Sequence, residues 1–189
     1  YHYHFSWLGM PIIQFPTDIM LMQELIWAVQ PDLIVDVGVA RGGSVIFYAS
    51  MLALIGETGK VVGIDVDIRP ENRHRIENHR LANRVSLVEG SSIDPEVIRQ
   101  VENVTRSANT TLVILDSNHS DEHVSTELRE YSNFVTKGSY LVVFDTIIES
   151  VPDQFNDGKP WGKGDNPFTA VESFLLNNKR FERDRTFEN

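Results

Sequence analysis

Short apolar runs alternate with stretches of helical apolar spacing along most of this 189-residue chain. Runs of this length and composition are typical of strands buried on both faces of a parallel sheet. The alternation predicts a doubly wound, Rossmann-like α/β fold with a mostly parallel central sheet. The five predicted strands are Leu33–Val39, Lys60–Asp65, Val85–Glu89, Thr111–Asp116 and Ser139–Phe144.

Proline and capping side chains mark the expected ends of several helices. Pro16–Gln30 has helical spacing and stops before Pro31, with Thr17 as the expected cap. Asp94-Pro95 and Asn166-Pro167 each place a capping side chain directly before a proline at the first helical position. These signals predict helices after both pairs.

Two segments depart from the alternation. Ile147 to Asp165 is rich in proline, glycine and aspartate and has no periodicity, so we expect a lid or a substrate loop. Phe181–Phe187 alternates like a strand, which predicts half of a hairpin whose partner strand lies outside this chain. The length favours one domain over residues 1–189, in which residues 1–30 form an N-terminal arm and helix.

Charge and cysteine content exclude several classes of function. A formal net charge of −10 argues against a nucleic-acid partner or an anionic membrane surface, because both require clustered Lys and Arg. The absence of cysteine excludes disulfides, thiolate metal sites and a cysteine nucleophile. We find neither a basic-then-apolar leader nor an apolar run of membrane-spanning length. We therefore expect a cytoplasmic enzyme for a small molecule, with a homo-oligomer left open.

The loop after the first predicted strand carries the clearest ligand-binding pattern. Gly38, Gly42 and Gly43 allow backbone amides to approach a ligand, and a helix beginning near Ser44 directs its positive end there. The spacing departs from the Gly-x-Gly-x-x-Gly of dinucleotide sites, which weakens a nicotinamide interpretation. Asp65 ends the next strand, where nucleotide sites place the acceptor for ribose hydroxyls.

Acidic and imidazole side chains follow the later strands. Asp116 and Asp145 come after two strands expected to be neighbours, so their carboxylates could share a magnesium ion. His119 lies three residues beyond Asp116, where an imidazole could remove a proton from a substrate hydroxyl. A loop histidine that only bonds backbone carbonyls is the alternative.

Several blocks together resemble the cephalosporin hydroxylase family, whose relatives include rhamnosyl O-methyltransferases. The blocks are Trp7–Asp18, Asp36–Ser44, Ile64–Asp67, Leu115–Ser120, Gly138–Thr146 and Asn166-Pro-x-x-Ala-Val. The resemblance implies S-adenosylmethionine (SAM) as cofactor and transfer of its methyl group to a hydroxyl of a natural product or sugar. It implies that Gly38, Gly42, Gly43 and Ser44 hold the methionine part, Asp65 the ribose, and Ser91 and Ser92 the adenine. Asp36, Ala40 and Asp116 complete the expected cofactor site.

The resemblance also implies a magnesium site made by Asp116 and an acidic pair after the fifth strand. In this chain that pair is Phe144-Asp145, so only Asp116 and Asp145 are left as expected metal ligands. Asn118 or Thr146 could replace the missing acid. Magnesium dependence is therefore doubtful, and His119 or Asp145 is expected to act as the catalytic base.

A SAM-dependent O-methyltransferase is thus the predicted function. The first alternative is an NAD(P)-dependent oxidoreductase on the same fold. The second is a catalytically silent SAM-binding partner protein, which the loss of an acid at Phe144 would explain.

Overall fold

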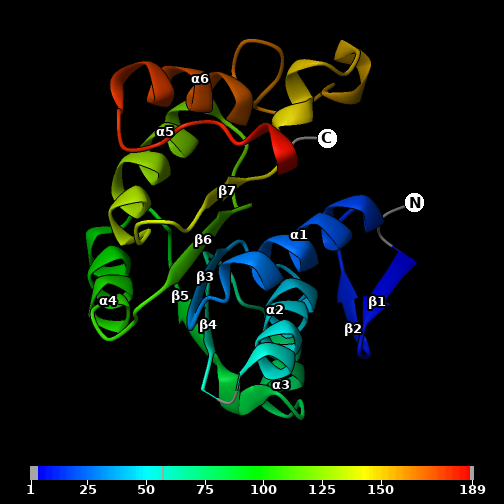
Figure 1. Ribbon diagram of the computed structural model, residues 1–189. Helices are drawn as coiled ribbons and strands as arrows, with labels where there is room; N and C mark the ends of the chain where they lie inside the picture. The colour runs from blue at the N-terminus through cyan, green and yellow to red at the C-terminus, as the bar shows by residue number, and fades with distance from the viewer. Residues whose placement is uncertain (1–3, 57, 188–189) are drawn as a thin grey trace.

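A five-stranded parallel sheet lies between two layers of helices in the computed structural model, which describes residues 4–56 and 58–187 (Figure 1). The strand order is β5-β4-β3-β6-β7, and every neighbouring pair is parallel. The strands are β3 (Leu33–Val37), β4 (Lys60–Asp65), β5 (Val85–Glu89), β6 (Thr111–Leu115) and β7 (Leu141–Val143). All five predicted strands are present, although those expected at Leu33–Val39, Thr111–Asp116 and Ser139–Phe144 are shorter than predicted. The order reverses between β3 and β6, where open α/β sheets bind their ligands.

The helices cover both faces of this sheet. One layer contains α1 (Pro16–Val29), α2 (Gly43–Ile55) and α3 (Pro70–Glu77), and the other contains α4 (Pro95–Thr105), α5 (Asp121–Tyr131) and α6 (Pro167–Asn177). Short 3₁₀ turns cover Ala82–Arg84, Ser132–Phe134, Thr146–Glu149, Asp153–Phe155 and Arg185–Phe187. Within residues 4–56 and 58–187, no helix has the length and apolar character needed to cross a membrane.

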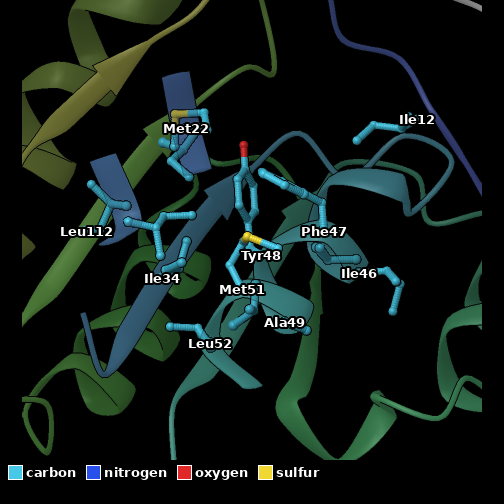
Figure 2. Packing of buried hydrophobic residues seen from close by; sticks show 14 of the residues in the cluster. Ile12, Met22, Ile34, Ile46, Phe47, Tyr48, Ala49, Met51, Leu52 and Leu112 are labelled. Atoms are coloured by element: carbon cyan, nitrogen blue, oxygen red, sulfur yellow. The ribbon is translucent and has the colours of Figure 1, made fainter. Parts of the chain in front are cut away.

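Helix α2 is buried around most of its circumference. It lies between the sheet, α1 and a hairpin of β1 (Phe5–Trp7) and β2 (Met10–Ile12), and its residues 43–52 are all buried. Figure 2 shows Met22, Ile34 and Phe47 around the ring of Tyr48 in this cluster. The indole of Trp7 contacts Phe47 edge-on at 4.9 Å between ring centroids. This packing fixes the position of the helix N-terminus at the carboxyl edge of the sheet.

The helix caps follow the sequence signals with one exception. Asp94 accepts a hydrogen bond from the amide of Glu96 at 2.7 Å, and Asn166 forms a capping box with Thr169. The expected cap at Thr17 is wrong, because α1 already begins at Pro16. The Thr17 hydroxyl donates to Asp18 Oδ1 and does not cap the helix. A proline at the first helical position places the start of the helix one residue earlier.

The strand expected at Phe181–Phe187 is also wrong. The segment is irregular and ends in the turn Arg185–Phe187. Its apolar side chains pack separately, with Phe181 5.8 Å from Phe174 and Phe187 5.8 Å from Tyr140 between ring centroids. The alternating pattern therefore reflects two aromatic contacts with neighbouring elements and no strand pairing.

Candidate functional site

The predicted site residues come from five loops that meet at one edge of the sheet. Because all five strands are parallel, their carboxyl ends point in the same direction. The residues at or just beyond these ends are Asp36 in β3, Asp65 in β4, Ser91 and Ser92 after β5, Asp116 and His119 after β6, and Asp145 after β7. The remaining predicted residues, Gly38, Ala40, Gly42, Gly43 and Ser44, connect β3 to α2.

Close backbone contacts require glycine at Gly38 and Gly43, and a left-handed φ of +87° favours it at Gly42. A Cβ added to Gly38, whose φ is +115°, would lie 2.2 Å from the carbonyl oxygen of Asp116. A Cβ on Gly43 would lie 2.4 Å from the carbonyl oxygen of Pro11, and one on Gly42 would meet a side chain of α3 at 2.7 Å. Their missing side chains thus bring the loop against β6, β2 and α3. Contact of their amides with a cofactor stays a prediction.

Asp65 and Asn72 hold the loop at Ala40. The amide of Ala40 donates to Asp65 Oδ2 at 2.8 Å, and Asn72 Nδ2 donates to the Ala40 carbonyl at 3.1 Å. These bonds stabilise a left-handed φ of +46°, which is unfavourable for alanine. Asp65 Oδ1 also accepts from the amide of Asp67 at 3.1 Å. Each carboxylate oxygen has a second lone pair, so Asp65 can still accept a ribose hydroxyl.

Asp36 is a buried acid at the base of the loop. Only 1% of the residue is exposed, and its Oδ2 accepts a hydrogen bond from the Ser44 hydroxyl at 2.7 Å. Its Oδ1 is buried and has no hydrogen-bond partner among the described residues. Burial raises the pKa of Asp36 to about 7, which the Ser44 hydrogen bond opposes and the charge of Asp65 reinforces. A hydrogen-bond donor with positive charge would therefore be stabilised beside Asp36.

Asp116, His119 and Asp145 form a second cluster. Each can offer one ligand atom, and these atoms all lie within 4.8 Å of one another. Burial raises the pKa of Asp116 well above its usual range, and the charges of Asp145 and Asp36 raise it further. His119 Nε2 contacts Asp145 Oδ2, and the imidazole stacks on Trp161 with ring centroids 4.7 Å apart. His119 Nδ1 is buried and has no hydrogen-bond partner among the described residues.

This cluster does not match an all-oxygen magnesium site. Magnesium prefers oxygen ligands in near-octahedral geometry, whereas the set here is two carboxylates and one imidazole. Phe144, at the position of the expected third acid, packs against the apolar core beside α2. Asn118 Oδ1 accepts from the Ser120 amide and hydroxyl, which occupies the oxygen that could have replaced it. The contact between His119 and Asp145 is instead that of an imidazole oriented by a carboxylate.

The two serines predicted to approach adenine differ in orientation. Ser91 lies on the loop after β5 and is partly exposed, and its carbonyl accepts from the amide of Asp94. Ser92 is 5% exposed, and its hydroxyl donates to Oε1 of the buried Glu127 at 2.5 Å. A contact between this loop and adenine stays a prediction, but the Ser92 hydroxyl already has a protein partner.

Glu127, a buried acid on α5, was not among the predicted site residues. The signal was present, because Val124, Glu127, Leu128 and Tyr131 share the buried face of α5. A carboxylate at such a core-facing position needs partners, and it therefore indicates a polar network.

The segment 147–165 contains two 3₁₀ turns, and hydrogen bonds join its start at Glu149 to its distal end. The amide of Asp121 donates to Asp165 Oδ1 at 2.7 Å, and Asn166 Nδ2 donates to Glu149 Oε2 at 2.6 Å and to the Gly162 carbonyl at 2.8 Å. These bonds fix the end of the segment to α5 and α6 and keep Trp161 beside the imidazole. Movement of the rest of the segment as a lid stays a prediction.

Comparison with known proteins identifies the family of this chain. A model of the rhamnosyl O-methyltransferase/CmcI family matches residues 1–189. The chain belongs to this family. The resemblance found in the sequence blocks is thus confirmed. A rhamnosyl O-methyltransferase of Mycobacterium tuberculosis is 30% identical over 172 residues, which cover 89% of this chain and 65% of the relative. The chain therefore spans about two thirds of the length of this curated relative.

Solved structures confirm the fold of this family member. A CmcI structure with magnesium and SAM has a TM-score of 0.61 at 17% identity and covers 92% of this chain and 67% of the other. An O-methyltransferase from Bacillus cereus in complex with S-adenosylhomocysteine (SAH) has a TM-score of 0.62 at 17% identity, with 87% and 69% covered. The predicted Rossmann-like methyltransferase fold is confirmed.

Proposed function

We propose that this chain is a SAM-dependent O-methyltransferase that acts on a hydroxyl of a sugar or another natural product. The family assignment supports the reaction class, and the names of the relatives support a glycosyl acceptor. The observation that carries the proposal is the group of carboxylates at the glycine loop, where the pKa values of Asp36 and Asp116 are raised by burial and by neighbouring negative charge. Such a group favours a positively charged ligand.

SAM has the charges that this group requires. Its ammonium and sulfonium are both cationic, and either one placed near Asp36 or Asp116 would relieve repulsion between buried carboxylates. Asp36 Oδ1 is buried and has no hydrogen-bond partner among the described residues, so an ammonium that displaces its cover could donate a hydrogen bond to it. Nicotinamide dinucleotides carry a pyrophosphate, which this acidic edge would repel. The electrostatics therefore favour SAM over the oxidoreductase alternative.

His119 and Asp145 supply the proton acceptor in the proposed reaction. With Nε2 held against Asp145, Nδ1 is the ring nitrogen that can take the hydroxyl proton of the acceptor, and because Nδ1 is buried, the groups that cover it have to move before the acceptor can reach it. The acceptor oxygen attacks the methyl carbon, the carbon–sulfur bond breaks, and its electrons stay on sulfur to give SAH. Asp145 orients the imidazole and stabilises its positive charge. This intact pair argues against a catalytically silent protein.

Magnesium enters no step of this proposal. When bound in relatives of this fold, a divalent cation would lower the pKa of an acceptor hydroxyl. The cluster in this chain offers two carboxylates, Asp116 and Asp145. Asp145 is already in contact with His119. The cytoplasmic location and the lack of a nucleic-acid partner also remain predictions from the sequence, and a homo-oligomer stays open.

Calorimetry with SAM, SAH and NADH tests the cofactor class. We expect SAM and SAH to bind, and Asp65→Ala to weaken binding by about 1–3 kcal/mol, the cost of leaving a partnered polar group unsatisfied. Glu77→Ala, an exposed carboxylate on α3, is the control and should bind like the wild type. An unchanged affinity of Asp65→Ala would remove Asp65 from the ribose site.

Methyl transfer to a panel of glycosides, followed by mass spectrometry, tests the reaction. Addition of 14 mass units to an acceptor hydroxyl, about the mass of one CH₂ group, is the expected product of O-methylation. Binding of NADH without SAM would favour the oxidoreductase. Binding of SAM without transfer to any acceptor, in a protein that keeps His119 and Asp145, would favour the silent partner.

A further inference from the structure

A buried polar network lies behind the carboxyl edge of the sheet and outside the proposed reaction centre. Its centre is Glu127 of α5, whose side chain is 0% exposed. Oε1 of Glu127 accepts hydrogen bonds from the hydroxyls of Ser92 and Ser117, each at 2.5 Å. His123, one turn earlier on α5, places Nε2 3.0 Å from the Ser92 hydroxyl oxygen and 3.3 Å from Glu127 Oε1. Two hydroxyls and an imidazole thus lie against one carboxylate oxygen.

The two serines belong to different loops of the site. Ser92 lies on the loop after β5, which is expected to approach the adenine. Ser117 follows Asp116 and lies two residues before His119, on the loop after β6. The backbone of Ser92 is also held, because its carbonyl accepts from the Tyr131 hydroxyl at 2.9 Å. Glu127 therefore joins the cofactor side and the catalytic side of the edge from one position on α5.

The cost of this arrangement makes a purely packing role a poor explanation. A buried carboxylate loses its hydration, and an apolar side chain of similar volume would satisfy the face shared by Val124, Leu128 and Tyr131 without that loss. Glu127 Oε2 is also buried without a hydrogen-bond partner among the described residues. A costly acid held by two short hydrogen bonds fixes geometry more than it adds stability.

We propose that Glu127 is a positioning residue that sets the loops after β5 and β6 relative to each other, so that cofactor binding and the orientation of the catalytic loop depend on one buried carboxylate. The proposal rests on the proposed methyltransferase function. Neither Glu127 nor Ser117 contacts the reacting atoms in it. The Ser92 hydroxyl links its loop to Glu127. This role is separate from any contact between the backbone of that loop and adenine.

The test compares Glu127→Gln with Glu130→Gln. Both acids lie on α5, but Glu130 pairs at the surface with Arg129 and contacts neither serine. Glutamine keeps the shape of Glu127 and removes its charge, so the two hydroxyl bonds weaken while the packing stays. We expect the dissociation constant for SAH to rise about tenfold in Glu127→Gln, as for loss of one charge-assisted hydrogen bond, and to stay within about twofold in Glu130→Gln.

Serine variants separate the two loops and avoid a carboxylate change in the core. Ser92→Ala should raise the KM for SAM with little change in kcat, whereas Ser117→Ala should lower kcat with little change in the KM for SAM. Ser92→Thr, which keeps the hydroxyl, should restore most of the affinity. Glu127→Gln combined with Ser92→Ala should weaken SAH binding by less than the product of the two single effects, because both changes act on the same hydrogen bond.

Hydrogen exchange without ligand keeps the inference separate from the proposed function. Amides of residues 90–94 and 116–120 should exchange faster together in Glu127→Gln and should not change in Glu130→Gln. If the wild type binds neither SAM nor SAH, the proposed function fails, and this exchange measurement still decides the role of Glu127. A lower melting temperature with unchanged SAH affinity, KM, kcat and loop exchange would overturn the inference.

Discussion

The substitution Gly38→Ala tests the packing of the glycine loop against β6. An added Cβ would lie 2.2 Å from the carbonyl oxygen and 2.6 Å from the carbonyl carbon of Asp116, and backbone atoms cannot turn away as a flexible side chain can. The left-handed φ of +115° costs about 1–2 kcal/mol for a residue with a Cβ. Forcing the two strand ends apart adds about 1–3 kcal/mol, the usual cost of overpacking. We therefore expect a total loss of about 2–5 kcal/mol in unfolding free energy.

Urea unfolding monitored by circular dichroism measures this loss, with Gly138→Ala as the matched control. Gly138 has a similar positive φ of +86°, but beyond its chain neighbours no heavy atom of the described residues lies within 4 Å of its added Cβ, so only the backbone cost of about 1–2 kcal/mol applies. The difference between the variants isolates the contact with Asp116. If Gly38→Ala unfolds at the same urea concentration as Gly138→Ala, the close approach of the loop to β6 is not what requires glycine at position 38.

Three further predictions concern the site. The pKa of Asp36 is about 7, and a cationic ligand favours the ionised acid. SAM should therefore bind with release of a proton, and about tenfold more weakly at pH 6 than at pH 8. Calorimetry that finds no pH dependence would contradict this. Turnover should survive EDTA at least in part and should fall strongly in His119→Ala. Phe144→Glu should tighten magnesium binding. If EDTA abolishes turnover, magnesium alone restores it and His119→Ala is still active, the metal-independent route is refuted. In the free protein, amides of residues 150–158 should exchange rapidly and become protected when an acceptor binds, and amides already protected without ligand would make the segment structural.

The sheet was predictable because its strands are short apolar runs with few competing interpretations. All five runs form strands, and the polar residues that end them meet at one edge because parallel strands all point the same way. Local signals were also reliable where one side chain decides the outcome, as at the caps Asp94 and Asn166. The family resemblance added the expected cofactor, which spacing alone left open between SAM and a dinucleotide.

The sequence was less informative where a side chain had two possible partners. Ser92 looked like a contact for adenine, but the direction of its hydroxyl depends on Glu127, which is 35 residues away. Gly42 and Gly43 looked like ligand-facing glycines, and their approach to α3 and β2 depends on tertiary packing. Phe181–Phe187 alternates in the manner of a strand because two of its rings contact different elements. In each case a contact between distant parts of the chain decided the outcome.

The hydrogen bonds that hold Gly162, Asp165 and Asn166 affect how strongly an acceptor could bind. A segment that orders over a ligand loses about 1–2 kcal/mol of backbone conformational entropy for each residue that becomes fixed. Residues 162–166 are already fixed by hydrogen bonds to Asp121 and Glu149 in the free protein. Their conformational entropy is therefore lost on folding and does not reduce the binding free energy of the acceptor. Only the residues between Glu149 and Trp161 would still have to order if the segment closes as a lid. Acceptor affinity should therefore depend on the bonds at Asp165 and Asn166 although neither residue needs to touch the acceptor.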